Sequence, residues 1–388
     1  MSSSVAEPRA HPALRFARDA LTSATLPARY YYEPEIGACE AEEIFFRTWQ
    51  LVGFLSELEE PGDYLTCDLL DQKVLVSRGK DGRLRAFHNV CMHRGHVLAE
   101  GRGSKTVFTC PFHAWSYDTT GALKAAGNAE NVAGFALGDF GLAELRCEAW
   151  ANMVFVNLDD GAAPMAAMYG DLEKEIRAAV PRFDDLVLAR RDSYDIACNW
   201  KIIFDGLECY HCPVIHPQAM GGEDSFMTET FDSYEHEWYS THIVRADMDI
   251  IENRPELLPY PITPGDDVID DYIWYMWPNY IFLAHPGSSN FHVTHALPTG
   301  LETVHRTVDH FFVNDPPDEV NVGQMNTHRD VIVPQDRAAM EGQQLGLRSR
   351  GFVQGRLMVD AEHSWRSEHG VHHFNRMVWE ALNGPRYP

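Results

Sequence analysis

The sequence contains no long hydrophobic run. No window approaches the roughly eighteen uninterrupted apolar residues that a membrane-spanning helix requires. The N-terminal residues MSSSVAEPRAHPALRF also lack the charged-then-apolar arrangement of a signal peptide. We therefore expect a cytoplasmic protein that neither crosses nor binds a membrane.

Basic residues are scarce. Lysine and arginine together number 32 against 57 aspartates and glutamates, a formal net charge of −25 at pH 7. Contacts with phosphate groups need a clustered excess of positive charge. This composition argues against a nucleic-acid partner and against an anionic membrane surface.

Three further features are missing or sparse. There is no internal repeat, and no G-x-G-x-x-G segment that would bind a dinucleotide. The 8 cysteines are scattered through 388 residues, which is unlike the dense framework of a small disulfide-bonded protein. In a cytosolic chain, such cysteines are more typical of metal ligands or buried thiols.

The length favours two domains, and the residue patterns suggest where they lie. At the start of residues 41–162, EAEEIFFRTWQ at 40–50 predicts a short amphipathic helix. The following GDYLTCDLLDQKVLVSRGKDGRLRAFHNV alternates apolar and polar residues around turn signals, which predicts a small all-β module. Residues 163–388 combine strand-like runs with helical periodicity in PQDRAAMEGQQLG and EHGVHHFNRMVWEALNGP. We expect an α+β protein in which the second domain is an antiparallel sheet packed by helices. Residues 1–40 should pack on that second domain.

Two short motifs in the β module each pair a cysteine with a histidine. CMHRGH begins at Cys91 and CPFH at Cys110, and the 16 residues between His93 and Cys110 leave room for a strand, a turn and a strand. Two thiolates and two imidazoles suit either tetrahedral zinc or a Rieske [2Fe–2S] cluster. Each motif supplies one sulfur and one nitrogen, so that each iron of a cluster could receive a like pair.

These motifs, CMHRGH…CPFHAW, resemble the Rieske motif of the Rieske non-heme iron oxygenases. The resemblance implies that Cys91, His93, Cys110 and His113 hold a [2Fe–2S] cluster. It further implies a Rieske domain at 41–162 and a catalytic mononuclear iron domain at 163–388. Because a Rieske cluster moves only single electrons, such an oxygenase needs a second metal site where dioxygen is activated.

The segment NWKIIFDGLECYHCPVIHP supplies candidates for that second site. His211 and His216 could provide two imidazoles for the facial triad of a non-heme Fe(II) site. On an unbroken helix, five positions would turn the two side chains by about 140° relative to each other. We expect Pro213 to disrupt the helix and let His216 turn back. Taken alone, the two histidines could also be ordinary polar residues near a helix end.

The family resemblance completes the second site. The segment is similar to the family's NWK…E-x-Y-H-x(4)-H pattern, which implies that His211 and His216 are iron ligands. The family's third ligand is an aspartate in a Glu-Asp pair that opens a downstream helix. VPQDRAAMEGQQLG matches that place, so Asp336 is the implied carboxylate ligand, although Gln335 stands where the family often has an acid.

Two acids near the histidines are candidate catalytic residues. By resemblance, Glu208 bridges the Rieske histidine of one subunit to the iron histidine of its neighbour in a head-to-tail homotrimer. The alternative is that Glu208 orients a ligand imidazole within its own chain. Asp205 could be a further supporting acid or could lie on a solvated helix face. Cys209 and Cys212 have the spacing of a redox dithiol, but no thioredoxin-like pattern surrounds them, and we expect both to pack around the iron segment.

A glutamate at 208 resembles the quaternary ammonium branch of the family, which acts on betaine, carnitine or choline. Aromatic faces hold methylated cations, and DDYIWYMWPNYIFLAHP is dense in aromatic residues, although any of these rings could equally be sheet core. The predicted pocket residues are Trp274, Tyr275, Trp277, Tyr280 and Phe282.

The implied enzyme is a terminal oxygenase that consumes O2 and leads to N-demethylation or C–N cleavage. Its electrons would come from NAD(P)H through a separate flavin and iron–sulfur reductase. An aromatic ring-hydroxylating oxygenase is the alternative, and a zinc-binding or electron-carrier protein without oxygenase chemistry is a more distant one.

Overall fold

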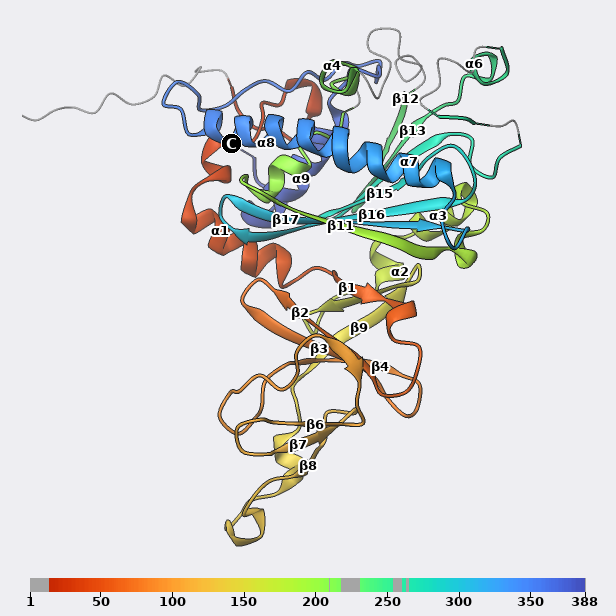
Figure 1. Ribbon diagram of the computed structural model, residues 1–388. Coiled ribbons are helices and arrows are strands. Elements are labelled where there is room, and N and C mark those ends of the chain that lie inside the picture. Colours follow the sequence, from red (N-terminus) through yellow and green to blue (C-terminus); the bar gives the residue numbers. More distant parts are fainter. Residues whose placement is uncertain (1–13, 209, 218–230, 254–259, 263–264, 388) are drawn as a thin grey trace, which may run out of the picture. The chain divides into compact units, whose positions relative to one another are not determined.

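Two structural units divide the chain (Figure 1). The computed structural model describes residues 14–208, 210–217, 231–253, 260–262 and 265–387. One unit consists of Ala41–Gly170, and the other combines the N-terminal segment up to Glu40 with Asp171–Pro388. The first boundary is the predicted one, whereas the second lies at Gly170 rather than at residue 162.

The Ala41–Gly170 unit is built from antiparallel strands, as the alternating pattern predicted. Its larger sheet has the strand order β1-β10-β9-β4-β3-β2-β5, and a three-stranded sheet has the order β6-β7-β8. The strands are β1 (Gln50–Phe54), β2 (Asp63–Leu69), β3 (Gln72–Arg78), β4 (Leu84–His88), β5 (Arg102–Ser104), β6 (Val107–Thr109), β7 (Ser116–Asp118), β8 (Leu123–Ala125), β9 (Glu144–Trp150) and β10 (Met153–Asn157). The helix α2 (Met165–Met168) closes the unit.

The two Cys–His motifs are joined by a strand, a turn and a strand, as their spacing predicted. The two strands are β5 and β6, but they do not pair with each other. Strand β5 joins the large sheet beside β2, while β6 pairs with β7 in the small sheet. The connection therefore carries the chain from one sheet to the other.

The second unit is organised around an antiparallel sheet with the order β11-β17-β16-β15-β14-β13-β12. Strands β12 to β17 each pair with the strand that follows in sequence, and the long strand β11 adds to the outer side of β17. The strands are β11 (Val187–Ile196), β12 (Phe231–Glu235), β13 (Tyr239–Val244), β14 (Asp271–Met276), β15 (Tyr280–Ala284), β16 (Asn290–Gly300) and β17 (Thr303–Phe312).

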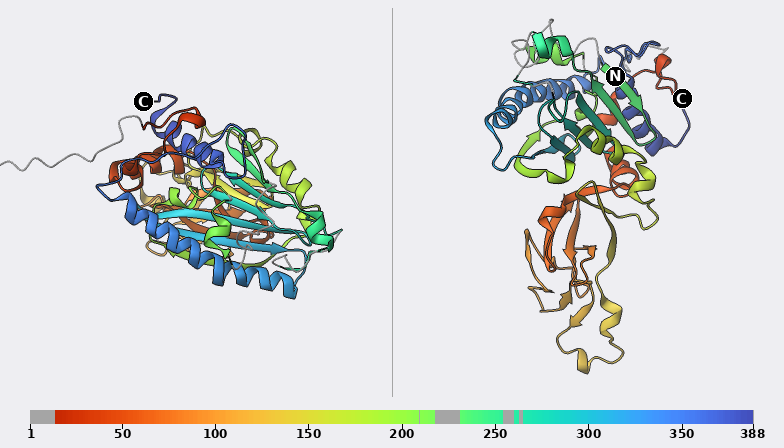
Figure 2. Two further views of the ribbon diagram at one scale, coloured as in Figure 1. Left: turned by 90° about the horizontal axis from the view of Figure 1, so that it is seen from above. Right: turned by 90° about the vertical axis from the view of Figure 1, so that its right-hand side faces the viewer.

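Helices pack around this sheet, as predicted for an α+β domain. Asp318 caps α7, because its carboxylate accepts a hydrogen bond from the backbone N–H of Asn321 at 2.9 Å. The helices are α1 (Pro34–Glu40), α3 (Leu172–Ala179), α4 (Cys212–Ile215), α6 (Met248–Asn253), α7 (Glu319–Thr327), α8 (Val333–Leu347) and α9 (His369–Asn383). The π-helical segment His328–Ile332 joins α7 to α8, and the three form a nearly continuous rod beside the sheet (Figures 1 and 2). No helix in the described ranges is long and apolar enough to cross a membrane.

The N-terminal segment packs on the second unit, as predicted. The carboxylate of Glu40 accepts a hydrogen bond from Trp200 Nε1 at 2.9 Å and forms a close ion pair with Lys201. The side chains of Glu40 and Lys201 are 4% and 0% exposed. This buried pair explains the role of Trp and Lys in the NWK motif, because it ties α1 to the segment that leads toward His211.

Replacing Glu40 with alanine should strongly destabilise the second unit. Lys201 would be left buried without a counter-charge, at a cost of about 3–5 kcal/mol in the free energy of unfolding. Glu33→Ala is the matched control, because the Arg29–Glu33 pair at 3.6 Å is exposed and should contribute about 0–1 kcal/mol. Urea unfolding followed by circular dichroism measures both, and equal midpoints for the two variants would contradict the structural role of this pair.

Candidate functional site

The two Cys–His motifs form loops that turn in the same way. In each loop, the residue four positions after the cysteine donates its N–H to the cysteine carbonyl oxygen, Gly95 to Cys91 at 2.9 Å and Ala114 to Cys110 at 3.0 Å. Both turning residues have positive φ, 75° and 58°. The two histidines therefore sit at different places in equivalent turns, His93 being two residues before the turning residue and His113 directly before it.

The loops bring all four predicted side chains to one end of the β unit. The two cysteines are buried, whereas His93 is exposed and His113 is half-buried. The imidazole rings lie edge to face with centroids 4.7 Å apart, and His93 stacks on Trp115 at 4.8 Å. Two sulfurs in the interior and two imidazoles at the surface are thus available together.

The second candidate site is a cavity of about 610 Å³ in the other unit. The segment around α4, the sheet strands β14 to β17, and the helices α7 and α8 all contribute to its wall. Four of the predicted residues line it, namely Glu208, His211, His216 and Asp336.

The predicted histidines flank a single helical turn. His211 is the N-terminal cap residue of α4 and His216 is its C-terminal cap residue. Pro213 does not break a helix between the two histidines, contrary to the prediction. It lies in the first turn of α4, where the missing N–H of proline costs no hydrogen bond. The shortness of α4, rather than a break in it, sets the relation between the two histidines.

His216 and Asp336 come into contact although they are distant in sequence. His216 Nε2 lies 2.9 Å from Asp336 Oδ1, and the other carboxylate oxygen lies 3.8 Å from the guanidinium of Arg306. On the far side of the ring, His216 Nδ1 lies 2.7 Å from the amide of Gln335. The predicted carboxylate ligand is therefore next to one predicted imidazole ligand.

His211 is turned toward Glu208 in the same chain. Its Nδ1 lies 3.2 Å from Glu208 Oε1, and its Nε2 lies 3.7 Å from the thiol of Cys212. Burial raises the pKa of Glu208, and Oε2 of this carboxyl group has no hydrogen-bond partner among the described residues. Cys212 lines the cavity rather than only packing behind it, and Cys209 lies outside the described residues.

Asp205 does not line the cavity, and it is not on a solvated helix face either. Its carboxylate accepts hydrogen bonds from the hydroxyl of Tyr31 at 3.2 Å, from Gln343 at 3.0 Å and from Asn375 at 3.4 Å. Burial raises its pKa to about 6. Asp205 joins the N-terminal segment to α8 and α9, so the structure assigns it a structural position rather than the predicted catalytic one.

The register of the sheet determines which residues face the cavity. Ile273 pairs with Leu283, Leu283 with His292, and His292 with His310 across four adjacent strands. Directly opposite residues in an antiparallel sheet share one face. All four residues of this row line the cavity.

The aromatic residues predicted to line the substrate pocket do not line this cavity. Trp274 pairs with Phe282 in the neighbouring row, which faces the opposite side of the sheet, and Phe282 packs against Phe291 at 5.5 Å. Two further rings pack against Phe374 of α9. The five aromatic residues are at most 1% exposed, and none lines the cavity: Trp274, Tyr275, Trp277, Tyr280 and Phe282. The expectation that they line the substrate pocket does not hold for this cavity.

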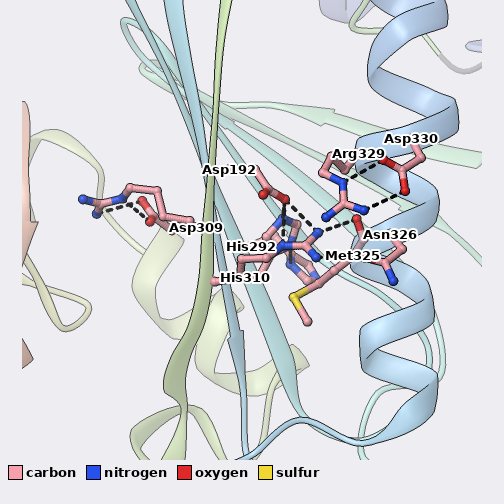
Figure 3. Close-up of polar contacts among 10 residues, drawn as sticks. Asp192, His292, Asp309, His310, Met325, Asn326, Arg329 and Asp330 are labelled. Atoms are coloured by element: carbon pink, nitrogen blue, oxygen red, sulfur yellow. Dashed lines mark hydrogen bonds and ion pairs between the residues drawn. The ribbon is translucent and has the colours of Figure 1, made fainter.

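The sequence interpretation missed a polar wall of the cavity. His292 Nδ1 and His310 Nδ1 are 2.9 Å apart, and His310 Nε2 lies 3.3 Å from Asp192, which is paired with Arg190 at 2.7 Å (Figure 3). Burial lowers the pKa of His310 to about 4 and that of His292 well below its usual value, so both rings are neutral at pH 7. Asp309 points away from this network on the other side of the sheet.

A period-two signal could have revealed this wall. Arg306, Val308 and His310 alternate along ETVHRTVDHFFVN, and all three line the cavity. Alternation places such residues on one face of a strand. His242, His285 and His328 also line the cavity.

The donor chemistry of both sites fits the metals that the sequence predicts. Thiolate and imidazole donors suit an iron–sulfur cluster, and two imidazoles with a carboxylate suit non-heme iron. In the part of the chain that the structure describes, no three His, Cys, Asp or Glu side chains are close enough together to hold a metal ion. Ligation by His211 therefore requires its ring to turn from its present contacts toward His216 and Asp336.

Comparisons with known proteins match both units. Residues 48–136 match the Rieske [2Fe-2S] domain, and residues 183–384 match the ring hydroxylating alpha subunit (catalytic domain). The carnitine monooxygenase oxygenase subunit of Escherichia coli is 35% identical over 357 residues, which cover 91% of this chain and 92% of that protein. The chloroplastic choline monooxygenase of Beta vulgaris is 28% identical and covers 94% of this chain and 78% of that protein.

Solved structures agree with these matches. The quaternary ammonium Rieske monooxygenase CntA in complex with L-carnitine has a TM-score of 0.81 at 31% identity, covering 93% of this chain and 96% of that chain. Inter-subunit electron transfer is described for CntA. Naphthalene 1,2-dioxygenase from a Rhodococcus species shares the fold, with a TM-score of 0.76 at 18% identity and coverage of 93% of this chain and 95% of that chain.

Neighbouring residues of β15 test the assignment of the two sheet faces. Phe282→Ala removes a fully buried ring and should lower the free energy of unfolding by about 3–5 kcal/mol. Ile281→Ala, on the half-buried cavity face, should cost about 1–2 kcal/mol because its side chain already borders open space. Denaturant unfolding distinguishes the two, and the reverse order would contradict this assignment.

Proposed function

Because the chain belongs to the family of Rieske oxygenases with a ring-hydroxylating alpha-subunit catalytic domain, we propose that it hydroxylates a small quaternary ammonium compound. The substrate class is that of betaine, carnitine or choline. Hydroxylation of an N-methyl carbon gives a hemiaminal that collapses to the demethylated amine and formaldehyde. Hydroxylation of another carbon beside the nitrogen breaks that C–N bond instead.

The observation that carries this proposal is the composition of the cavity. His211, His216 and Asp336 line one cavity of about 610 Å³, which has room for a small substrate. Among the described residues that line it, four carboxyl groups, those of Glu208, Asp271, Glu319 and Asp336, face one guanidinium group, that of Arg306. An excess of acidic groups favours a cationic substrate. The rings of Phe231 and Tyr260 remain available for cation–π contact in place of the expected cage.

Two metal centres would supply the redox chemistry. Cys91, Cys110, His93 and His113 are proposed to hold the cluster, and His211, His216 and Asp336 the mononuclear iron. When bound there, the cluster would supply single electrons, and the mononuclear iron would supply the site at which dioxygen reacts. The exposure of His93 suits the exchange of electrons with a partner at the protein surface.

The chain's own residues position the reactants. Ile273, Leu283 and Val308 provide an apolar surface that limits water around the substrate. Arg306 lies beside the Asp336 carboxylate and steadies its charge. Glu208 Oε1 lies 3.2 Å from His211 Nδ1, and Oε2 of this carboxyl group has no hydrogen-bond partner among the described residues. We propose that Glu208 also bridges to His113 of a neighbouring subunit in a head-to-tail homotrimer. Inter-subunit electron transfer is described for CntA.

Electrons must come from another protein, a reductase that oxidises NAD(P)H. The sequence has no G-x-G-x-x-G segment for a dinucleotide, which supports a separate flavin and iron–sulfur component. The balanced reaction joins substrate, O2, NAD(P)H and a proton to give hydroxylated product, water and NAD(P)+.

An aromatic ring-hydroxylating oxygenase is the second candidate. The aliphatic side chains on the cavity face of β14, β15 and β17 would also accept a flat apolar ring. They are Ile273, Ile281, Leu283 and Val308. The acidic groups argue against an aromatic acid as its substrate, because like charges would meet in a confined space.

Substituting a ligand cysteine should remove the cluster. Cys110→Ala should lose the visible absorption and the acid-labile sulfide of a [2Fe–2S] centre, because a buried sulfur ligand is missing. Cys147→Ala, in β9 of the same unit and outside both loops, should keep them. Iron and sulfide analysis measures both variants. Wild-type protein that contains zinc and no labile sulfide would overturn the assignment.

A single-turnover experiment tests the substrate class. Iron-loaded protein, reduced without oxygen and then exposed to O2 with betaines, carnitine, choline or aromatic acids, should yield formaldehyde or a C–N cleavage product from one cation. His211→Ala should keep the cluster spectrum and lose the product, while His305→Ala, an exposed control, should retain both. Mass spectrometry identifies the products. A hydroxylated ring from an aromatic acid would instead support the second candidate.

A further inference from the structure

Gln335 contacts His216, a proposed iron ligand, but is not itself one of the proposed ligands. It precedes Asp336 in the first turn of α8, and its amide lies 2.7 Å from His216 Nδ1. The ring is thus held between two side chains from the same turn, with Asp336 at Nε2 and Gln335 at Nδ1. A hydrogen bond between Gln335 and Nδ1 therefore also affects Nε2, the ring nitrogen that faces Asp336.

The amide group can serve the ring in two orientations. With its oxygen toward the ring, Gln335 accepts a hydrogen bond from a protonated Nδ1. With its nitrogen toward the ring, it donates to Nδ1 and also to the backbone oxygens of Ile215 at 3.1 Å and Val331 at 3.3 Å. The second orientation satisfies more partners while His216 Nε2 carries the proton that it shares with Asp336.

Metal binding requires the other arrangement. A neutral imidazole that ligates a metal through Nε2 must carry its proton on Nδ1. With its oxygen toward the ring, the amide of Gln335 can then accept a hydrogen bond from the Nδ1–H group, so Gln335 supports both tautomers. A carboxylate in the same place could only accept, and it would place a full negative charge beside the ring.

We propose that Gln335 is a positioning residue that holds the ring of His216 in place and, being neutral, makes it a weaker electron donor to iron than a carboxylate at this place would. The inference rests on the proposed function, because it takes His216 and Asp336 as iron ligands. Arg306 acts in the same direction, since its guanidinium lies 3.8 Å from the Asp336 oxygen that faces away from His216. Together the two residues keep the iron site less electron-rich, which favours the ferrous over the ferric ion.

Three variants separate the hydrogen bond from the charge. Gln335→Met keeps the length of the side chain and removes both hydrogen-bonding arrangements. Gln335→Glu keeps an acceptor and adds one negative charge beside His216. Arg337→Gln is the matched control, because it shifts the net charge by the same amount on the same helix at an exposed ion pair with Glu341, 2.8 Å long.

The first readout is metal affinity, measured by Co(II) absorption titration and Fe(II) competition on the cluster-containing protein. Gln335→Met should bind the mononuclear metal about 10–100-fold more weakly, as expected when the outer partner of a ligand histidine is lost. Arg337→Gln should match the wild type. Wild-type affinity in Gln335→Met would overturn the positioning role.

The second readout is the potential of the mononuclear iron, followed by the ferric electron paramagnetic resonance signal in a redox titration. Gln335→Glu should lower it, with ferric binding strengthened relative to ferrous binding on the order of tenfold, which corresponds to about 59 mV. A shift no larger than that of Arg337→Gln would overturn the electronic part of the inference.

A further pair of variants tests the premise separately. His216→Ala and Asp336→Asn should abolish Co(II) binding at this site. If both variants still bind cobalt as the wild type does, the ligand assignment in the proposed function is wrong. If both lose cobalt while the Gln335 variants behave as the wild type, only the role of Gln335 is wrong.

Discussion

The register of the antiparallel sheet is the constraint on which the catalytic unit depends. Strand side chains alternate with a period of two, so a shift of one residue would exchange the two faces of β14 to β17. In the observed register, the row from Ile273 to His310 faces the cavity, and the row from Trp274 to Asp309 faces the opposite side. The cavity wall, its histidines and its apolar patch all follow from this pairing.

The proposed metal site adds a second constraint, because its residues come from two distant segments. The short helix α4 presents His211 and His216 at its ends, and the first turn of α8 brings Gln335 and Asp336 against His216. The buried pair of Glu40 and Lys201 ties α1 to the start of the segment that leads to α4. A stable position for the imidazoles therefore depends on packing well outside the site itself.

Much of the site could be predicted from residue type and spacing. The two Cys–His motifs and the His211–His216 segment carry specific donor sets, and the structure brings each set to one place. The aromatic residues of DDYIWYMWPNYIFLAHP led to a wrong prediction of the pocket lining, because composition does not show which face of a strand a residue occupies. Trp274 and Phe282 are β-strand core, whereas the aliphatic residues beside them in sequence, Ile273, Ile281 and Leu283, line the cavity. Asp205 misled for a similar reason, since its partners lie on segments far away in the sequence.

The sequence by itself determined the two-domain α+β organisation, the family and the donor types, because local patterns and motif spacings depend only on residues close together in the sequence. Only the tertiary structure decided which side chains meet. It set the faces of the sheet through strand register, and it joined His216 to Asp336 and Gln335 across more than a hundred residues of chain. It also placed Glu208 on His211 and assembled the neutral imidazole wall of His292 and His310. Such contacts depend on long-range packing, which the local sequence does not encode.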